Sequence, residues 1–152
     1  MRFASGVHAV VVWSILLIAG CAQPSTTTTD TGEPGSATKL STNEMFARLP
    51  DRDAADCLGR LEFSNARTAT GQSTCGNRFS GTTDRPLEAG LVCVYSATPK
   101  TRTAAEVIAV GYFVCADSST GEVRFAEASG RAGGVATVTA DDGRVVNFTY
   151  EN

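Results

Sequence analysis

The chain begins with an apolar segment that ends at a cysteine, and this segment determines the environment in which the rest of the sequence must fold. Arg2 precedes the segment, and residues 9–17 are mainly Val, Ile, Leu and Ala. A positive residue followed by a short apolar stretch is the layout of a secretory signal peptide. The stretch is shorter than the roughly 20 apolar residues that a membrane-spanning helix needs. We therefore expect the remainder of the chain to fold outside the cytoplasm.

The end of the apolar segment, Ile18-Ala19-Gly20-Cys21, resembles the lipobox of bacterial lipoproteins. In that family the cysteine thiol receives a diacylglycerol, a peptidase cleaves just before the cysteine, and acyl chains such as palmitate anchor the mature protein. The resemblance covers only residues 1–21, and it implies that residues 1–20 are removed. It also implies that Cys21 holds the protein on the extracytoplasmic face of the cell membrane. The alternatives are an ordinary signal peptide, in which Cys21 is incidental, and an uncleaved anchor helix.

Removal of the signal changes the composition that matters for function. The mature chain keeps 12 of the 13 basic residues and all 16 acidic ones, so its net charge is −4. A nucleic-acid partner is therefore not expected. The signal also contains His8 and Trp13, the only histidine and the only tryptophan. Without histidine, the mature chain cannot use a Ser-His or Cys-His mechanism or an imidazole metal ligand. We expect no cofactor and no metal site.

The basic residues are mostly arginine, and lysine occurs only at Lys39 and Lys100. Ala, Gly, Thr and Val are abundant, as GC-rich genomes tend to encode. This composition favours an actinobacterial source.

We divide the chain into a signal peptide (1–20), a tether (21–40) and one globular domain (41–152). The tether is rich in Ser, Thr, Pro and Gly and has few apolar side chains, so we expect it to be disordered. The remaining residues, about 110, suffice for a single core.

The domain is predicted to be α+β, with one or two short N-terminal helices packed on an antiparallel sheet of five to six strands. Ser41 and Glu44 have the spacing of a helix-capping box, and Pro50 ends that helix. A second helix is expected over 51–58. Strands are expected over 61–67, 91–95, 107–115 and 123–125, with a connection at 99–102 and a hairpin turn at 141–143. The stretch 68–86 is rich in Gly, Ser and Thr and is assigned no strand of its own, and Cys75 and Phe79 are expected to point inward from it.

Four cysteines remain after Cys21, and an even number in an exported domain indicates two disulfides. Cys93 and Cys115 have the parity to lie on one face of adjacent antiparallel strands. We therefore favour Cys93–Cys115 and Cys57–Cys75 among the three connectivities. A four-cysteine zinc site is the alternative, but the close C-x-x-C spacing is missing.

Three function classes fit these features, and we expect the first. It is a lipid-anchored binding or accessory module for an envelope protein, a glycan or a small ligand. The second is an inhibitor or exclusion factor directed against an envelope-attacking enzyme.

The third class is a hydrolase that uses two carboxylates across a cleft. Its candidate acids are Asp84, Glu88, Glu106, Glu122 and Glu127. We expect no enzyme, because no nucleophile or phosphate-binding motif accompanies these acids. Two basic loops, Pro99 to Thr103 and Gly130 to Gly134, are interpreted as ordinary solvated loops.

Replacement of Cys21 tests the anchor. Cys21→Ser removes the thiol that would accept the lipid, so the protein should leave the membrane fraction or accumulate as an unprocessed precursor. Fractionation and intact-mass measurement read both outcomes, with Ser25→Ala as the control. An unchanged mature mass and an unchanged membrane location would contradict the lipoprotein assignment.

Overall fold

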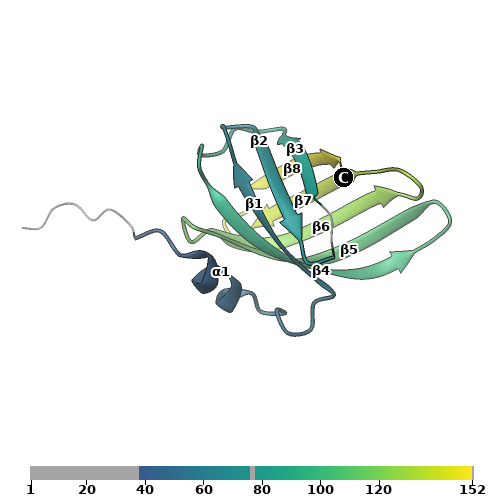
Figure 1. Cartoon of the computed structure of the whole chain (residues 1–152), viewed down its shortest axis with the longest axis horizontal. Coiled ribbons are helices and arrows are strands. Elements are labelled where there is room, and N and C mark those ends of the chain that lie inside the picture. The colour runs from purple at the N-terminus through teal and green to yellow at the C-terminus, as the bar shows by residue number, and fades with distance from the viewer. Residues whose placement is uncertain (1–37, 76–77, 152) are drawn as a thin grey trace, which may run out of the picture. The chain divides into compact units, whose positions relative to one another are not determined.

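The computed structural model describes residues 38–75 and 78–151, which form one short helix and eight strands (Figure 1). The strands close into an antiparallel barrel in the order β1-β2-β3-β8-β7-β6-β5-β4. The elements are α1 (Thr42–Arg48), β1 (Cys57–Phe63), β2 (Thr68–Ser73), β3 (Arg78–Thr83), β4 (Val92–Arg102), β5 (Glu106–Cys115), β6 (Thr120–Ala128), β7 (Gly134–Ala140) and β8 (Val145–Glu151). Cys21 and the rest of residues 1–37 lie outside the described residues.

The predicted α+β sheet of five to six strands is therefore wrong. The stretch 68–86, to which no strand was assigned, contains β2 and β3, and these strands join β1 to β8. Pairing of β1 with β4 then closes the barrel. Thr favours extended backbone, and an inward glycine leaves room for a ring from the next strand, so a Gly- and Thr-rich sequence suits a tightly closed barrel.

The second predicted helix is also wrong. Residues 50–54 form turns, held by a hydrogen bond from the amide of Ala54 to the carbonyl of Asp51 (2.9 Å), and Cys57 already belongs to β1. The acidic residues near position 51 suit a turn as well as they suit the first turn of a helix, and pairing of Cys57 with Ala97 of β4 selects the strand.

The predicted first helix is confirmed with its capping box. The Ser41 side chain accepts from the Glu44 amide, and the Glu44 carboxylate accepts from the Ser41 amide at 2.8 Å. Met45 and Leu49 are buried in a patch outside the barrel, together with Val94, Val114 and Ala116. This helix therefore covers the outer face of β4 and β5, and these two strands are buried on both faces at that level, as their continuous apolar pattern predicts.

The chain joins the barrel just before the helix. The Leu40 amide donates to the carbonyl of Ala116 at 2.8 Å, and Lys39 forms an ion pair with Glu88. Among the residues that the structure describes, no helix has the length and apolarity needed to cross a membrane.

Both predicted disulfides are confirmed. Cys93 lies directly opposite Cys115 in the β4–β5 pairing, and Cys57 is bonded to Cys75. They tie opposite ends of the barrel, because Cys57 begins β1 whereas Cys93 lies near the start of the antiparallel β4. Short closed loops of this kind stabilise a small domain by about 3 kcal/mol each in the chain-entropy model.

The predicted register of the last hairpin is also confirmed. Val138 opposes Val146, and Gly143 has a φ of 84°, the left-handed conformation expected after Asp142. The predicted connection at 99–102 is wrong, because these residues continue β4 through a bulge and the turn follows at 103–105. Pro99 lies in this part of β4, beyond the pairing with β1, where its missing amide hydrogen costs no bond to that strand.

The inner wall of the barrel pairs glycines with aromatic rings from the neighbouring strand. A Cβ atom added to such a glycine would collide with the ring that lies over it. The directly opposed pairs are Gly59 with Tyr95, Gly71 with Phe79, and Gly121 with Phe113. The rings of these pairs lie over the glycines on the inner wall of the barrel.

Substitution of one inward glycine tests this arrangement. Gly59→Ala places a methyl group where the Tyr95 ring lies, and this overpacking should lower the free energy of unfolding by about 1–3 kcal/mol. Denaturant unfolding of the oxidised protein measures the loss. In the Tyr95→Ala background the same change should cost far less, because the ring is gone. The exposed neighbour Arg60→Ala serves as the control, and equal losses for Gly59→Ala and Arg60→Ala would refute the pairing.

Candidate functional site

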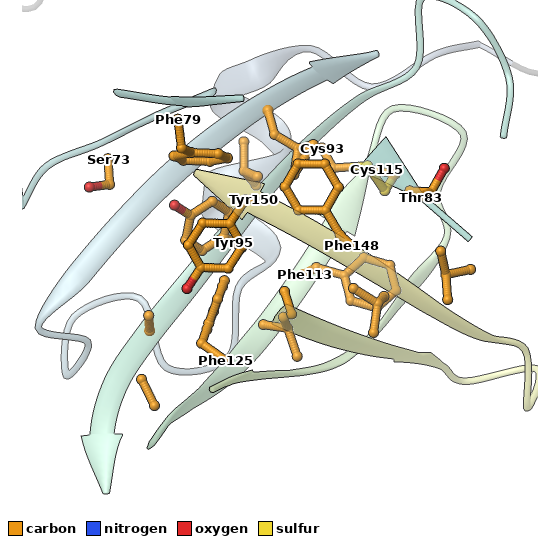
Figure 2. A pocket seen from close by; sticks show the side chains of 18 of the residues that line it. Ser73, Phe79, Thr83, Cys93, Tyr95, Phe113, Cys115, Phe125, Phe148 and Tyr150 are labelled. Carbon is orange, nitrogen blue, oxygen red and sulfur yellow. A yellow bond between two sulfur atoms is a disulfide. The ribbon is translucent and has the colours of Figure 1, made fainter. Parts of the chain in front are cut away.

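The barrel encloses a cavity of about 920 Å³, and its lining is mainly aromatic and aliphatic (Figure 2). Closed barrels of eight strands are wide enough either to be filled by side chains or to hold one small ligand. Pockets that bind small molecules measure about 300–1,000 Å³ and have apolar walls with a few polar groups. The size and the lining of this cavity fall within that description.

One end of the barrel, the β3–β4 end, is covered by the connection between these strands. Leu87 packs against the core, and its amide donates to the carbonyl of Ala66 at 2.7 Å. Leu91 is buried, and its carbonyl accepts from the amide of Phe63 at 2.9 Å. These contacts hold apolar side chains across part of this end, where the exposed Glu88, Asp117 and Arg144 also line the cavity.

The opposite end, the β4–β5 end, carries polar groups and opens to solvent. Arg102, Glu127, Asp56 and Ser73 line the cavity here, and Arg102 and Asp56 are exposed. In Figure 1 the β4–β5 hairpin extends past β1 and β2 at this end. We call this end the mouth.

Four aromatic side chains from four strands surround the cavity between its middle and the mouth, and we call them the aromatic collar. They are Phe79, Tyr95, Phe125 and Tyr150. Consecutive ring centroids lie 6.1, 5.2, 6.2 and 5.9 Å apart around this circuit. Figure 2 shows the collar residues on one side of the view and the disulfide of Cys93 on the other. Tilted and edge-on contacts of this kind are the favoured geometry for aromatic rings.

Two tyrosine hydroxyls give the collar a polar part. The Tyr150 hydroxyl donates to Glu127 Oε1 at 2.6 Å. Burial raises the pKa of Tyr150 above its ordinary value, and the hydrogen bond to Glu127 raises it further. Burial, followed by the charge of Glu127, raises the pKa of Tyr95. The Tyr95 side chain is buried, and its hydroxyl forms no hydrogen bond with a described residue, so it remains a free donor inside the barrel.

The five candidate acids of the sequence do not assemble into one site. Asp84 accepts from the backbone and the side-chain amide of Asn147, both at 2.9 Å, and these bonds lower its pKa. Glu88 and Glu127 line opposite ends of the cavity. Glu106 and Glu122 are exposed and are not among the lining residues.

No metal site is found in the described part of the chain, where no three His, Cys, Asp or Glu side chains gather around a common point. The cysteines predicted from the sequence are used in the two disulfides, and these lie in the wall of the cavity.

Sequence reasoning missed the aromatic collar, although part of its signal is present. Phe148 and Tyr150 alternate with polar residues in β8, which places both rings on one face of that strand. That this face encloses a cavity depends on closure of the barrel. The two basic loops predicted to be merely solvated lie side by side at the mouth, because β4–β5 and β6–β7 both turn there.

Comparisons with protein-family models, with curated proteins and with solved structures find no match to this chain. The function of the site is therefore inferred from the residues that line the cavity.

The buried tyrosines predict a dependence of stability on alkaline pH. Because folding raises their pKa values, the folded state favours the protonated hydroxyls. This contribution is complete below about pH 10, the ordinary tyrosine value, and is lost as the pH rises through the raised values. Unfolding in denaturant at increasing pH should show the decline, and Tyr150→Phe should reduce its slope.

The matched control is Tyr112→Phe, which removes a partly exposed hydroxyl and leaves both buried ones in place. It should retain the decline of the unaltered protein. If Tyr150→Phe and Tyr112→Phe changed the slope equally, the hydroxyl of Tyr150 would not be buried against Glu127.

Proposed function

We propose that this protein is a binding module of the cell envelope, anchored through a lipid on Cys21, and that it holds a small apolar or aromatic molecule inside its barrel. The observation that carries the proposal is the 920 Å³ cavity with the aromatic collar. The lipid anchor is inferred from the sequence alone. It would hold the binding activity at the cell membrane.

The chemistry of the lining supports an apolar ligand. Each aromatic ring of the collar offers a large apolar surface, and removing such surface from water stabilises a complex by about 25 cal/mol per Å². A cavity with preformed walls also requires little reordering of the protein on binding, which reduces the entropic cost. Water held against these rings gains few hydrogen bonds, so its displacement favours an apolar ligand.

Binding without chemistry is the simplest interpretation of the polar groups. Glu127 is bonded to Tyr150, and Asp84 and Glu88 are used in contacts with Asn147 and Lys39. These contacts position side chains and loops of the barrel. They leave no two of the candidate acids facing each other across the cavity.

The proposal is tested with a neutral apolar probe whose fluorescence rises in apolar surroundings, N-phenylnaphthylamine. The chain from residue 21 onward, with Cys21→Ser to avoid the acyl anchor, should bind it in a saturable manner at one site. Ala109→Trp places an indole in the cavity beside the collar and should abolish binding. Ala126→Trp, on a neighbouring strand but not in the lining, is the control and should bind normally.

Equal binding by the two tryptophan variants would place the probe outside the barrel. An absence of saturable binding by the unaltered protein would contradict the small-ligand proposal and favour a protein or glycan partner. Native mass spectrometry of protein purified from its own cells provides an independent check, because a retained ligand adds a discrete mass.

A further inference from the structure

We propose that the ligand of this cavity is an amphiphile with an apolar chain and an anionic head group, a carboxylate or a phosphate, and that Arg102 binds the head group at the mouth. This inference rests on the proposed function and names the ligand class for the same site. It depends on the direction, the partners and the surroundings of Arg102.

The β-bulge in β4 directs Arg102 toward the cavity. Pro99 opposes Ala109, and both line the cavity. In a regular strand the side chain of Arg102, three positions after Pro99, would point outward. The pairing instead shifts between Pro99 and Thr101, so that Arg102 opposes Val107, which is also a lining residue. A bulge commonly reorients a side chain in this way beside a functional site.

Arg102 retains its hydrogen-bonding capacity for a ligand. It forms no ion pair within the part of the chain that the structure describes. Two acids, Asp56 and Glu127, line the cavity at the mouth. Glu127 opposes Val107 and is therefore two strands from Arg102, roughly 10 Å between backbones. Its carboxylate accepts from Tyr150 instead. The planar guanidinium offers two parallel donors that match a carboxylate or a phosphate.

A second donor faces the cavity nearby. Tyr95 is buried on β4, and its hydroxyl lies over Gly59 on the inner wall without a protein acceptor among the described residues. A ligand with acceptor oxygens satisfies this hydroxyl, whereas a ligand with only donors would have to compete with Tyr150 for Glu127. The donor groups of the mouth therefore favour an acceptor-rich, anionic head group.

The mouth carries both basic and acidic residues. Lys100 forms the bulge and Arg131 lies in the β6–β7 connection, while Glu106 begins β5 of the same β4–β5 hairpin and Asp56 and Glu127 line the cavity. Cations near an opening raise the local concentration of anions. The aromatic collar lies behind Arg102, so an apolar chain can extend past the rings while its charged end remains at the solvent boundary.

The experiment compares three probes with the same chain: dodecanoic acid, dodecyl phosphate and the neutral dodecanol. Each displaces N-phenylnaphthylamine from the Cys21→Ser chain beginning at residue 21. Both anions should bind more tightly than dodecanol. Arg102→Gln should weaken the tighter anion by roughly ten- to a hundredfold, the cost of one charge-assisted interaction, and leave dodecanol unchanged. The relative affinity of the two anions distinguishes a fatty acid from a phosphate-bearing lipid.

Lys100→Gln is the matched control. It removes a positive charge two residues before Arg102 in the same strand, and Lys100 does not line the cavity. It should change anion binding by less than about threefold, as expected for an exposed charge. If Arg102→Gln had no more effect than Lys100→Gln, or weakened dodecanol equally, the anionic head group would be ruled out while the cavity remained a binding site. If the unaltered protein bound neither the fluorescent probe nor any amphiphile, the proposed function itself would fail.

Discussion

The contact between inward glycines and aromatic rings of the neighbouring strand is the interaction on which the rest of the barrel depends. Gly59 gives the Tyr95 ring a place on the wall, and Gly71 does the same for Phe79. These rings bury apolar area over the glycines and leave a cavity of about 920 Å³ inside the barrel. The barrel therefore closes around a cavity instead of a solid core, and the same rings that hold the wall together provide the apolar surface offered to a ligand.

A hollow barrel of this size has less buried surface than a filled one, and other parts of the chain compensate. The disulfides Cys57–Cys75 and Cys93–Cys115 join strands at the two ends of the barrel. The helix adds a second apolar patch outside β4 and β5, centred on Met45. These devices stabilise the wall from outside and from its ends. The interior is consequently free to be shaped for binding, with Leu87 and Leu91 packed across part of the β3–β4 end and Arg102 at the mouth.

The sequence predicts local features of this fold well and its closure poorly. The helix cap at Ser41, the disulfide pairing and the register of the last hairpin follow from short-range patterns, and all three are confirmed. The strands in 68–86 were missed because Gly and Thr without large apolar residues resemble a loop when read alone. Their strand character depends on contacts with Phe79, within the stretch, and with Phe148, which is distant in sequence. The same dependence hid the cavity, since the rings of Phe79 and Tyr95 come together only when β1 pairs with β4 and the barrel closes.

The central claim is that the rings line an open interior instead of filling it. A crystal structure of the chain from residue 21 onward, purified from its own cells without detergent, tests this most directly. The account predicts electron density for a bound molecule in the cavity, against the rings of Tyr95, Phe125 and Tyr150 and extending toward Arg102. A barrel whose interior is filled by side chains, with no space left for a ligand, would contradict it.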